Sequence, residues 1–469
     1  IKRKFLVFLF RKNPEFIDSN NLKIETNKLI VPIWSDSKEK VFKKTKEGFS
    51  FNLLNAEYLF SNNFEWHLEK LNFGTRLWKL NLHYFEWIQS ASDDEFEFFV
   101  NDWINKNKPY QKDYWMDSWN SYALSIRVVV WMGEIAKRKE KLNHNFLQKI
   151  NKSIIKQIIF LENNLELDIG GNHIIKNIKA LYWASCFYKG KEAVRWRSLA
   201  NYHLKKEIDK QILEDGFHFE LSPSYHCQVF EDLLDCWNLI EDSEIKSVLK
   251  QKLDIMANVI IHMTHPDGKI ALFNDGGLNM ARDPKELIGT YCRLLKTEHS
   301  IQKSYSFKNS GYHIFKNDFF YFVYDAGLVG PNELPAHSHG DIFSFELTIK
   351  NQRFIVDNGV FEYNSGEKRN ISRSTCSHNT LTIDNHDQCE FWSSFRMGRR
   401  AVINVDKLIN NNDNLYIDSS HNGYKHLTGK PIHQRSVSCS KSGRIVIKDD
   451  IIGGNKQSII SRLLIHPDI

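Results

Sequence analysis

Several features that identify other classes of protein are missing from this sequence of 469 residues. No run of apolar residues reaches the ~18 needed to span a membrane, and the segment FLVFLF near the start is far too short. The seven cysteines show no CxxC or zinc-knuckle spacing, and their odd number argues against a disulfide framework. We therefore expect them to be mostly core thiols.

Catalytic and cofactor signatures are missing as well. The sequence has no GxSxG elbow, so a serine hydrolase has little support. It also lacks a P-loop and a dinucleotide fingerprint, which argues against a nucleotide cofactor. Because the chain begins at Ile1 rather than Met, a removed signal peptide is neither shown nor excluded.

A strong charge of one sign is also missing, since 63 basic and 57 acidic residues leave a net charge of only +6. Basic residues are scattered except in residues 38–46, which are better explained as a solvated stretch than as a nucleic-acid patch. We expect no nucleic-acid partner, whereas a polyanionic substrate is compatible with this charge. Aromatic residues are abundant, at 13% with 12 Trp, and are enough to fill a core and line a ligand groove.

The spacing of apolar residues divides the chain into two parts. From about residue 60 to 305 they recur at helical spacing, and helices are expected around residues 119–139 and 174–189 and from Ser222-Pro223 onward. After Gly311 the pattern changes to short strand-like runs separated by Asn, Asp and Gly. Helices followed by strands predict a multidomain α+β protein whose β part is an antiparallel sandwich. We assign residues 1–60 to an N-terminal extension, 61–305 to the helical domain and 311–469 to the β domain.

The most informative stretch is Ala-His-Ser-His-Gly-Asp at residues 336–341, which leads into an expected strand. In an extended chain alternate residues share a face, so His337, His339 and Asp341 would project together. Two imidazoles and a carboxylate suit a zinc ion. The alternative is that each is an ordinary polar residue.

Two further polar residues could join this group. Asp357 lies on the next expected strand, and His378 begins another. A simple hairpin that turns near residue 351 would pair Asp357 with Phe345 rather than with His339, so a bend or another pairing is needed to bring them together.

A second constellation lies in the helical part. Gly170-Gly171-Asn172-His173 precedes an expected helix, so Asn172 is well placed as its N-cap, and capping explains the Asn as well as catalysis does. Tyr225 falls in the first turn after Ser222-Pro223, where a core aromatic is the alternative explanation. Both positions lie at helix N-termini, which favour an anion such as a phenolate or a substrate carboxylate.

These residue types suit β-elimination from an acidic sugar. The reaction removes the weakly acidic proton at C5, beside the uronate carboxyl, and places additional negative charge on that carboxyl. Asn amides, imidazoles and helix N-termini can neutralise this charge, as the donors of an oxyanion hole do. A His or a Tyr of lowered pKa can take the proton, and a Tyr can protonate the leaving oxygen.

Six motifs resemble the heparinase II/III family of polysaccharide lyases, in the family's order and over nearly the whole chain from about Phe73. They are GNHIIKNIKALYWA at 171–184, DGFHFELSPSYHCQVFEDLLD at 215–235, HPDGKIALFNDGG at 265–277, AHSHGDIFSFEL at 336–347, FIVDNG at 354–359 and RSTCSHNTLTID at 373–384. The resemblance implies an N-terminal (α/α) toroid of helix pairs followed by a C-terminal antiparallel β-sandwich. It also implies cleavage of an acidic polysaccharide or oligosaccharide.

The resemblance gives each catalytic candidate a role. It makes Asn172 and His173 neutralisers of the carboxylate, Tyr225 the general acid and also a candidate base, and His337 a second base or a neutraliser. We therefore expect the site to draw on both domains.

The resemblance also implies a structural divalent metal, usually zinc, held by His339, Asp357 and His378. Candidate substrate contacts are Trp115, Trp119, His226, Tyr363 and Arg373, for each of which packing is the alternative explanation.

Two departures from the family pattern stand out. Several members carry a Glu shortly after the neutralising Asn or His, where this chain has Lys176 and Asn177. Relatives also continue with further strands beyond the final LLIHPDI, so the resemblance implies a sandwich that is truncated at its C-terminus. It favours a periplasmic or exported location, although the unpaired cysteines suit the cytoplasm nearly as well.

Two other functions remain open at this stage. A non-catalytic glycan-binding or surface-polysaccharide assembly protein could use the same scaffold. A metal hydrolase could use His339, Asp357 and His378 to activate water.

Overall fold

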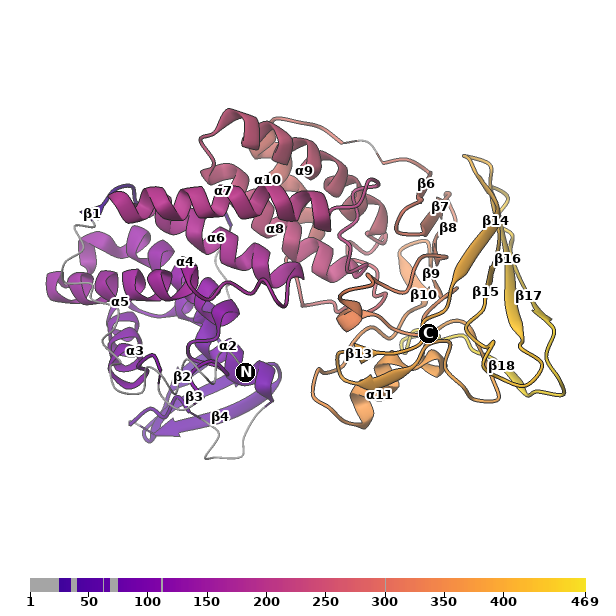
Figure 1. Ribbon diagram of the computed structural model, residues 1–469, viewed down its shortest axis with the longest axis horizontal. Coiled ribbons are helices and arrows are strands. Elements are labelled where there is room, and N and C mark those ends of the chain that lie inside the picture. Colours follow the sequence, from indigo (N-terminus) through magenta and orange to yellow (C-terminus); the bar gives the residue numbers. More distant parts are fainter. Residues whose placement is uncertain (1–24, 35–39, 62, 68–74, 111–112, 300) are drawn as a thin grey trace. The chain divides into compact units, whose positions relative to one another are not determined.

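The computed structural model describes residues 25–34, 40–61, 63–67, 75–110, 113–299 and 301–469, so residues 1–24 of the predicted N-terminal extension lie outside the described residues. The chain forms two compact units, one of residues up to 205 with 239–241 and one of residues 206–238 with 242–469. Figure 1 shows helices in the earlier part of the sequence and sheets in the later part, as the apolar spacing predicts. The domain limits assigned from the sequence stay predictions.

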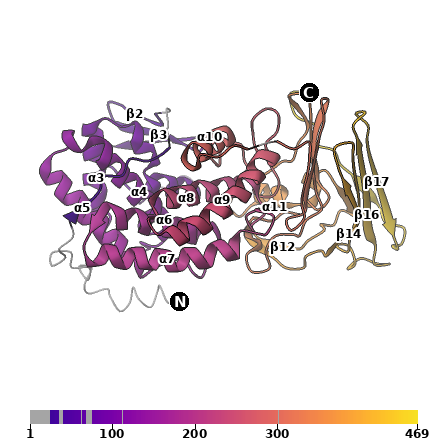
Figure 2. The same ribbon diagram turned by 90° about the horizontal axis from the view of Figure 1, so that it is seen from above.

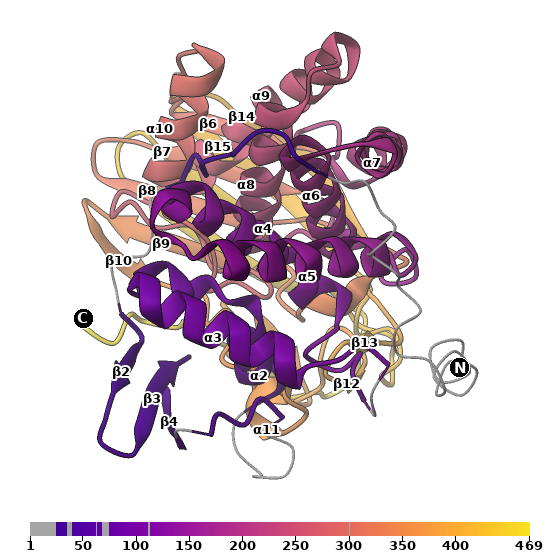
Figure 3. The same ribbon diagram turned by 90° about the vertical axis from the view of Figure 1, so that its left-hand side faces the viewer.

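The first unit contains a small antiparallel sheet of β2 (Phe42–Lys44), β3 (Gly48–Leu53) and β4 (Ala56–Ser61). Phe42 and Phe51 of this sheet contact Phe99 of α3 (Asp93–Lys106) edge to face, at ring-centroid distances of 5.5 and 5.8 Å. Figure 3 shows the sheet and this helix. The contacts explain why part of the predicted extension is folded: its aromatic face is buried against a helix.

The helices of the first unit form as their caps and apolar spacing predict. Helix α4 packs against α2, α5 and α6, and the side chain of Asn120 accepts hydrogen bonds from the first-turn amides of Tyr122 and Ala123. The bounds are α2 (Arg76–Tyr84), η2 (Glu86–Ser90), α3 (Asp93–Lys106), α4 (Ser121–Arg138), η3 (Lys139–Lys141), α5 (His144–Glu162), α6 (Gly171–Phe187) and α7 (Lys191–Gln211), with β1 (Glu25–Thr26) paired to β5 (Tyr188–Lys189).

The start of α6 differs from the prediction. The helix begins at Gly171, and Gly170 before it has a φ of 71°, a left-handed conformation that glycine adopts without a steric penalty. Asn172 is therefore a residue of the first turn rather than the N-cap, and its side chain is buried.

The second unit begins with helices and continues as a sandwich. Its helices are α8 (Pro223–Leu239), α9 (Ser243–Met263) and α10 (Pro284–Leu295). Helix α8 starts at the Ser-Pro pair, as predicted, and α10 starts at Asp283-Pro284 with the Asp283 side chain as its cap.

Two antiparallel sheets form the sandwich, which confirms the predicted fold class. One, of residues 304–355, has the order β10 (Gln352–Ile355), β9 (Phe345–Ile349), β8 (Phe320–Asp325), β7 (Tyr312–Lys316) and β6 (Ser304–Phe307). The other, of residues 403–452, has the order β14 (Ile403–Asn410), β15 (Asn414–His421), β16 (Ile432–Ser440) and β17 (Ile445–Ile452). Their inward faces share one hydrophobic core that includes Phe322, Phe345, Ile417 and Val437. Figure 2 shows the two sheets.

The remaining bounds complete the second unit. Smaller elements are η4 (Pro335–His337), α11 (Glu367–Arg373), η5 (Thr375–Ser377), the pair β11 (Leu381–Ile383) and β18 (Ile459–Ser461), and the hairpin of β12 (Phe391–Ser393) and β13 (Arg396–Met397).

Two irregularities shape the loops beside the sandwich. The β9–β10 pairing shifts between Arg353 and Ile355, so Phe354 is an extra residue in its strand. The stretch expected to be extended at residues 336–341 instead contains a 3₁₀ turn, Pro335–His337, and β9 begins only at Phe345. Simple alternation along a strand is therefore wrong for this stretch.

Two predictions from composition can also be compared with the structure. All seven cysteines are free, and five of them are buried, as expected for core thiols. Within the described ranges, no helix combines the length and apolar character that a membrane crossing requires.

Candidate functional site

Three aromatic side chains of the second unit meet at the start of α8. The rings of Tyr225 and His337 lie face to face, with centroids 4.0 Å apart and planes tilted by 31°. The hydroxyl groups of Tyr225 and Tyr363 are 2.9 Å apart and share a hydrogen bond. The helical and the β-rich parts of the sequence thus both contribute to one cluster.

A buried aspartate fixes the imidazole in this cluster. Nδ1 of His337 lies 2.8 Å from Oδ2 of Asp275 and donates to it. The backbone amide of Asp275 in turn donates to the carbonyl of His337 at 3.0 Å. Because Nδ1 carries the proton, Nε2 keeps its lone pair and is available as a base.

Asp275 serves a second histidine as well. Its other oxygen, Oδ1, accepts a hydrogen bond from Nε2 of His339 at 2.8 Å. The guanidinium of Arg369 pairs with both oxygens of the carboxylate, and its Nη2 lies 3.0 Å from Oδ2. One carboxylate therefore orients two imidazoles that are two residues apart in the sequence.

The charge of Asp275 is strongly favoured even though the side chain is buried. Burial alone raises the pKa of a carboxyl group, but the charge of Arg369 and the hydrogen bonds from His337 and His339 outweigh it, so the pKa lies well below its usual value. Glu220 adds a second carboxylate, with Oε2 3.7 Å from Nε2 of His337.

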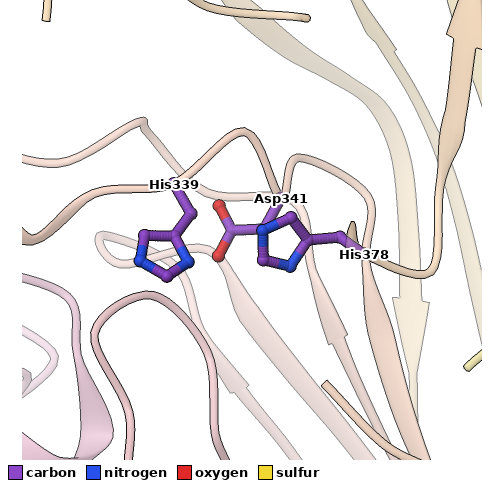
Figure 4. A group of neighbouring side chains, drawn as sticks. All are labelled: His339, Asp341 and His378. Carbon is purple, nitrogen blue, oxygen red and sulfur yellow. The ribbon is translucent and has the colours of Figure 1, made fainter. Parts of the chain in front are cut away.

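A group that could hold a metal ion lies beside this cluster. His339, Asp341 and His378 each offer a ligand atom, and these atoms lie within 4.8 Å of one another (Figure 4). Nδ1 of His339 and Nε2 of His378 are buried and have no hydrogen-bond partner among the described residues. Since buried polar atoms are rarely left unpaired, two such nitrogens beside a buried carboxylate fit a divalent cation.

The opposite ring nitrogens are held by carboxylates, as is usual for metal-binding histidines. Nε2 of His339 donates to Asp275, and Nδ1 of His378 donates to Asp357 at 2.9 Å. Burial lowers the pKa of His378, but the charge and hydrogen bond of Asp357 raise it to about 9. The same interaction makes the ring a stronger electron donor to a metal.

The ligand group differs in one member from the set that the resemblance implied. Asp341 belongs to the group, whereas Asp357 supports His378 and also accepts a hydrogen bond from Ser344 at 3.0 Å. This placement agrees with the hairpin argument from the sequence, which put Asp357 beside Phe345 rather than beside His339. Asp357 holds Nδ1 of His378, and its own role as a metal ligand stays a prediction.

In the first unit, the predicted neutralisers lie in the first turn of α6. Asn172 is buried, and Nδ1 of His173 lies 3.3 Å from Oε1 of the fully buried Glu166. The backbone amide of Glu166 donates to the side chain of Asn177 at 2.9 Å, and Asn177 Nδ2 donates back to Glu166 at 3.3 Å.

The predicted substrate contacts separate into two groups. His226 is fully buried between the His218 amide, 3.1 Å from Nδ1, and the Met256 carbonyl, 3.0 Å from Nε2. Trp119 is a core residue that packs on Phe160. These contacts account for both side chains by packing.

The other three contacts have different surroundings. Arg373 is buried and donates to the backbone carbonyls of Ser338 and Ser393 at 3.0 and 2.8 Å, so it holds loops together. Trp115 is half-buried, and Tyr363 joins the Tyr225 cluster.

Sequence reasoning missed Asp275, Arg369 and Glu220. Asp275 and the neighbouring Asn274 stood in the motif at 265–277 but received no role. Asn274 accepts from the His339 amide at 2.9 Å, and its own amide donates to Asp341 at 3.1 Å. A conspicuous Asn-Asp-Gly-Gly turn between two helices was the available signal.

The architecture places the chain in a class of α+β proteins with a C-terminal β-sandwich that includes solved heparinase structures. A heparinase III crystal structure aligns with a TM-score of 0.68 at 19% identity, covering 84% of this chain and 66% of that one. The heparan sulfate lyase HepC from Pedobacter heparinus aligns with a TM-score of 0.59 at 20% identity, covering 97% of this chain and 75% of that one. At these identities the likeness concerns the fold.

The sequence identifies the family. The family description Heparinase II/III N-terminus matches residues 8–302, and Heparinase II/III-like, C-terminal matches residues 302–469. The chain belongs to the heparinase II/III family.

Among its relatives, the chain is 28% identical over 315 residues to a heparin-sulfate lyase of Bacteroides stercoris, an alignment that covers 62% of this chain and 45% of that protein. It is 27% identical over 242 residues to the heparin-sulfate lyase of Pedobacter heparinus, covering 46% of this chain and 36% of that protein. The alignments thus span less than half the length of these relatives.

Proposed function

We propose that this chain cleaves an acidic, uronate-containing polysaccharide of the glycosaminoglycan type by β-elimination. The observation that carries the proposal is the contact between the rings of Tyr225 and His337. The hydroxyl of Tyr225 is hydrogen-bonded to Tyr363, and the imidazole of His337 is hydrogen-bonded to Asp275. Family membership and the names of the relatives, which are heparin-sulfate lyases, support the substrate class.

The reaction removes the proton from C5 of the uronate. The electron pair left at C5 forms the C4–C5 double bond, the bond from C4 to the bridging oxygen breaks, and that oxygen takes up a proton. The protein must therefore supply a base, an acid and positive charge for the carboxylate.

Tyr225 is suited to act as the acid and His337 as the base. The hydrogen bond between the Tyr225 and Tyr363 hydroxyl groups, 2.9 Å long, can stabilise a Tyr225 phenolate after it has released its proton. Asp275 holds the proton of His337 on Nδ1, which leaves Nε2 to accept the C5 proton and lets the carboxylate stabilise the resulting imidazolium. Buried Glu220, 3.7 Å from Nε2, stabilises the same charge.

Asn172 and His173 would neutralise the substrate carboxylate. Both lie in the first turn of α6, where the helix dipole favours an anion. Glu166 holds one nitrogen of His173 and leaves the other ring edge for a ligand, since the side chain is one-third exposed.

A divalent metal would be held by His339, Asp341 and His378. When bound, such an ion supplies positive charge that neutralises Asp341 and links the loops that carry the three ligands. The free ring nitrogens of His339 and His378 are inaccessible to solvent, which supports a structural ion rather than one that activates water. Hydrolysis by a metal-bound water is therefore less well supported than elimination.

The test is to offer the purified protein heparan sulfate, heparin, alginate and bacterial capsular glycans and to record ultraviolet absorbance. Elimination creates unsaturated uronate ends that absorb, whereas hydrolysis creates saturated ends that do not. Rising absorbance with a glycosaminoglycan is the expected result. A flat trace with every glycan, together with retained binding, would replace the lyase by a glycan-binding scaffold protein.

A further inference from the structure

The β12–β13 hairpin of the second unit presents an exposed aromatic ring beside the proposed catalytic residues. Ser393 pairs with Arg396, so Ser394 and Phe395 form a two-residue turn at the tip. Phe395 is 42% exposed. Its ring lies nearly parallel to that of Tyr363, with centroids 5.9 Å apart and planes tilted by 14°, and 6.4 Å from the ring of His337.

Buried arginines of α11 anchor the tip of the hairpin. Nε of Arg369 donates to the Ser394 carbonyl at 3.0 Å. Nη1 of Arg373 donates to the carbonyls of Ser393 and Arg396 at 2.8 and 3.3 Å. Burying guanidinium groups is unfavourable unless their donors are used, and here the donors hold three carbonyl groups of one short turn. The position of Phe395 is therefore fixed before any ligand binds.

The ring itself is also held in place. The guanidinium carbon of Arg369 lies 5.5 Å from the ring centroid of Phe395 and 5.3 Å from that of Tyr363, within the range of cation–π attraction. A single exposed apolar residue is ordinary on a protein surface. An exposed ring that a charged group fixes against Tyr363 and beside the proposed base His337 is not explained by packing alone.

The neighbouring residue contributes free positive charge. Arg396 is exposed, and within the described part of the chain its guanidinium makes no hydrogen bond or ion pair. A guanidinium can bind a sulfate or carboxylate through two parallel hydrogen bonds. The hairpin therefore combines an apolar platform with a free cationic group, as an anionic sugar requires.

We propose that the β12–β13 hairpin is a carbohydrate subsite, in which Phe395 stacks on the apolar face of a sugar ring and Arg396 pairs with an anionic substituent of the same chain. The inference rests on the proposed function for the substrate class. It adds two residues that bind the substrate without taking part in proton transfer.

The test measures binding separately from turnover. The Tyr225→Phe protein serves as the parent, and a size-defined heparan sulfate hexasaccharide is titrated into it by calorimetry. Phe395→Ala is expected to weaken binding about 10-fold and Arg396→Gln about 5-fold. Phe395→Trp should retain the affinity, whereas Phe395→Leu, which keeps apolar volume without a ring, should not.

The chain offers a matched control for each change. Phe319 is an exposed Phe at the β7–β8 turn, and Arg444 is an exposed Arg at the β16–β17 turn. Phe319→Ala and Arg444→Gln should leave the affinity within 2-fold of the parent. Equal affinity in Phe395→Ala and the controls, or no binding by the parent, overturns the subsite.

Cleavage by the wild-type protein is recorded in parallel. Binding that depends on Phe395, without any unsaturated product, would refute the proposed elimination and support the subsite. Cleavage with a KM unchanged by Phe395→Ala and Arg396→Gln would support the elimination and refute the subsite.

Discussion

Asp275 joins two neighbouring histidines whose surroundings differ. On one side, His339 and His378 have no exposed side-chain surface, and their free nitrogens face a buried carboxylate. On the other side, the His337 side chain is 12% exposed and lies against Tyr225. Asp275 therefore supports two groups: a buried group of His339, Asp341 and His378 that is suited to a metal, and an accessible group of His337 and Tyr225 that is suited to proton transfer. The histidines of the two groups differ in solvent exposure rather than in residue type.

Asp275→Asn should disturb both the buried group and the accessible group, and should lower the rate of elimination more than any other substitution. An amide can no longer fix the proton on Nδ1 of His337 or neutralise Arg369, so the rate of elimination should fall about 10⁴-fold. Asp449→Asn is the matched control, because Asp449 also accepts from a histidine and an arginine, with Nε2 of His433 and Nε of Arg435 both at 2.7 Å. Comparable loss of turnover in both variants would mean that Asp275 acts only through folding.

Tyr225→Phe should disturb only the accessible group of Tyr225 and His337. Removal of the proposed general acid is expected to reduce kcat about 10³-fold. The melting temperature should change little, because the hydrogen bond to Tyr363 contributes little to the free energy of unfolding. Ultraviolet rates and thermal melting measure the two effects. Tyr424→Phe, which removes a buried hydroxyl that donates to the Leu381 carbonyl at 2.6 Å, is the control and should retain kcat. Wild-type turnover by Tyr225→Phe would refute the mechanism.

Substitutions in the buried group and at its partner Asp357 should lower the affinity for a metal to different extents. Asp341→Ala removes a proposed ligand and should lower zinc affinity by more than about 100-fold, whereas Asp357→Asn disturbs only the partner of His378 and should lower it about 10-fold. Competition with a chelator, followed by metal analysis, measures the zinc affinity of each variant. A larger loss of affinity in Asp357→Asn than in Asp341→Ala would support Asp357 as the ligand. Metal removal from the wild type should lower the melting temperature more than kcat.

Asp275 also predicts a dependence of stability on pH. Because its pKa in the folded protein lies well below the unfolded value of about 3.9, its contribution is present above about pH 4 and is lost as the pH falls further. The pH dependence should be measured in chelator-treated protein, so that metal loss does not contribute to it. Urea unfolding of wild type and Asp275→Asn between about pH 6 and pH 3 measures it. Parallel pH profiles would contradict the prediction.

His226→Gln should have the smallest effect on the reaction. Its ring bonds only to backbone groups, so the change should lower the free energy of unfolding by about 2 kcal/mol and leave KM unchanged. Denaturant unfolding and steady-state kinetics measure the two quantities. A selective rise in KM would return His226 to the substrate contacts.

The order of elements was predictable because it depends on local periodicity and turn chemistry. The Ser222-Pro223 start of α8 and the strands after residue 311 are present as expected. Local rules were less reliable at single positions. The conformation of Gly170 moved the helix start ahead of Asn172, and the 3₁₀ turn after Pro335 replaced an extended segment.

The site was predictable only in part, since its contacts join residues far apart in the sequence. Tyr225 and His337 were named from chemistry and resemblance, and the structure brings them together. Asp275 and Arg369, 94 residues apart, could not be paired by any local pattern. Arg373 was a candidate substrate contact with packing as the alternative, and in the structure its guanidinium donates to backbone carbonyls.

The extra residue in β10 has a consequence for how this chain can change over time. Arg353 pairs with Thr348 and Ile355 pairs with Leu347, so Phe354 has no partner of its own in the pairing. Opposite residues of an antiparallel pair share a face, and Thr348 and Leu347 lie on opposite faces. Deletion of Phe354 would therefore leave Ile355 and the residues after it on the faces they have now. The length of this hairpin should thus be able to change by one residue at position 354 while Asp357 stays beside His378.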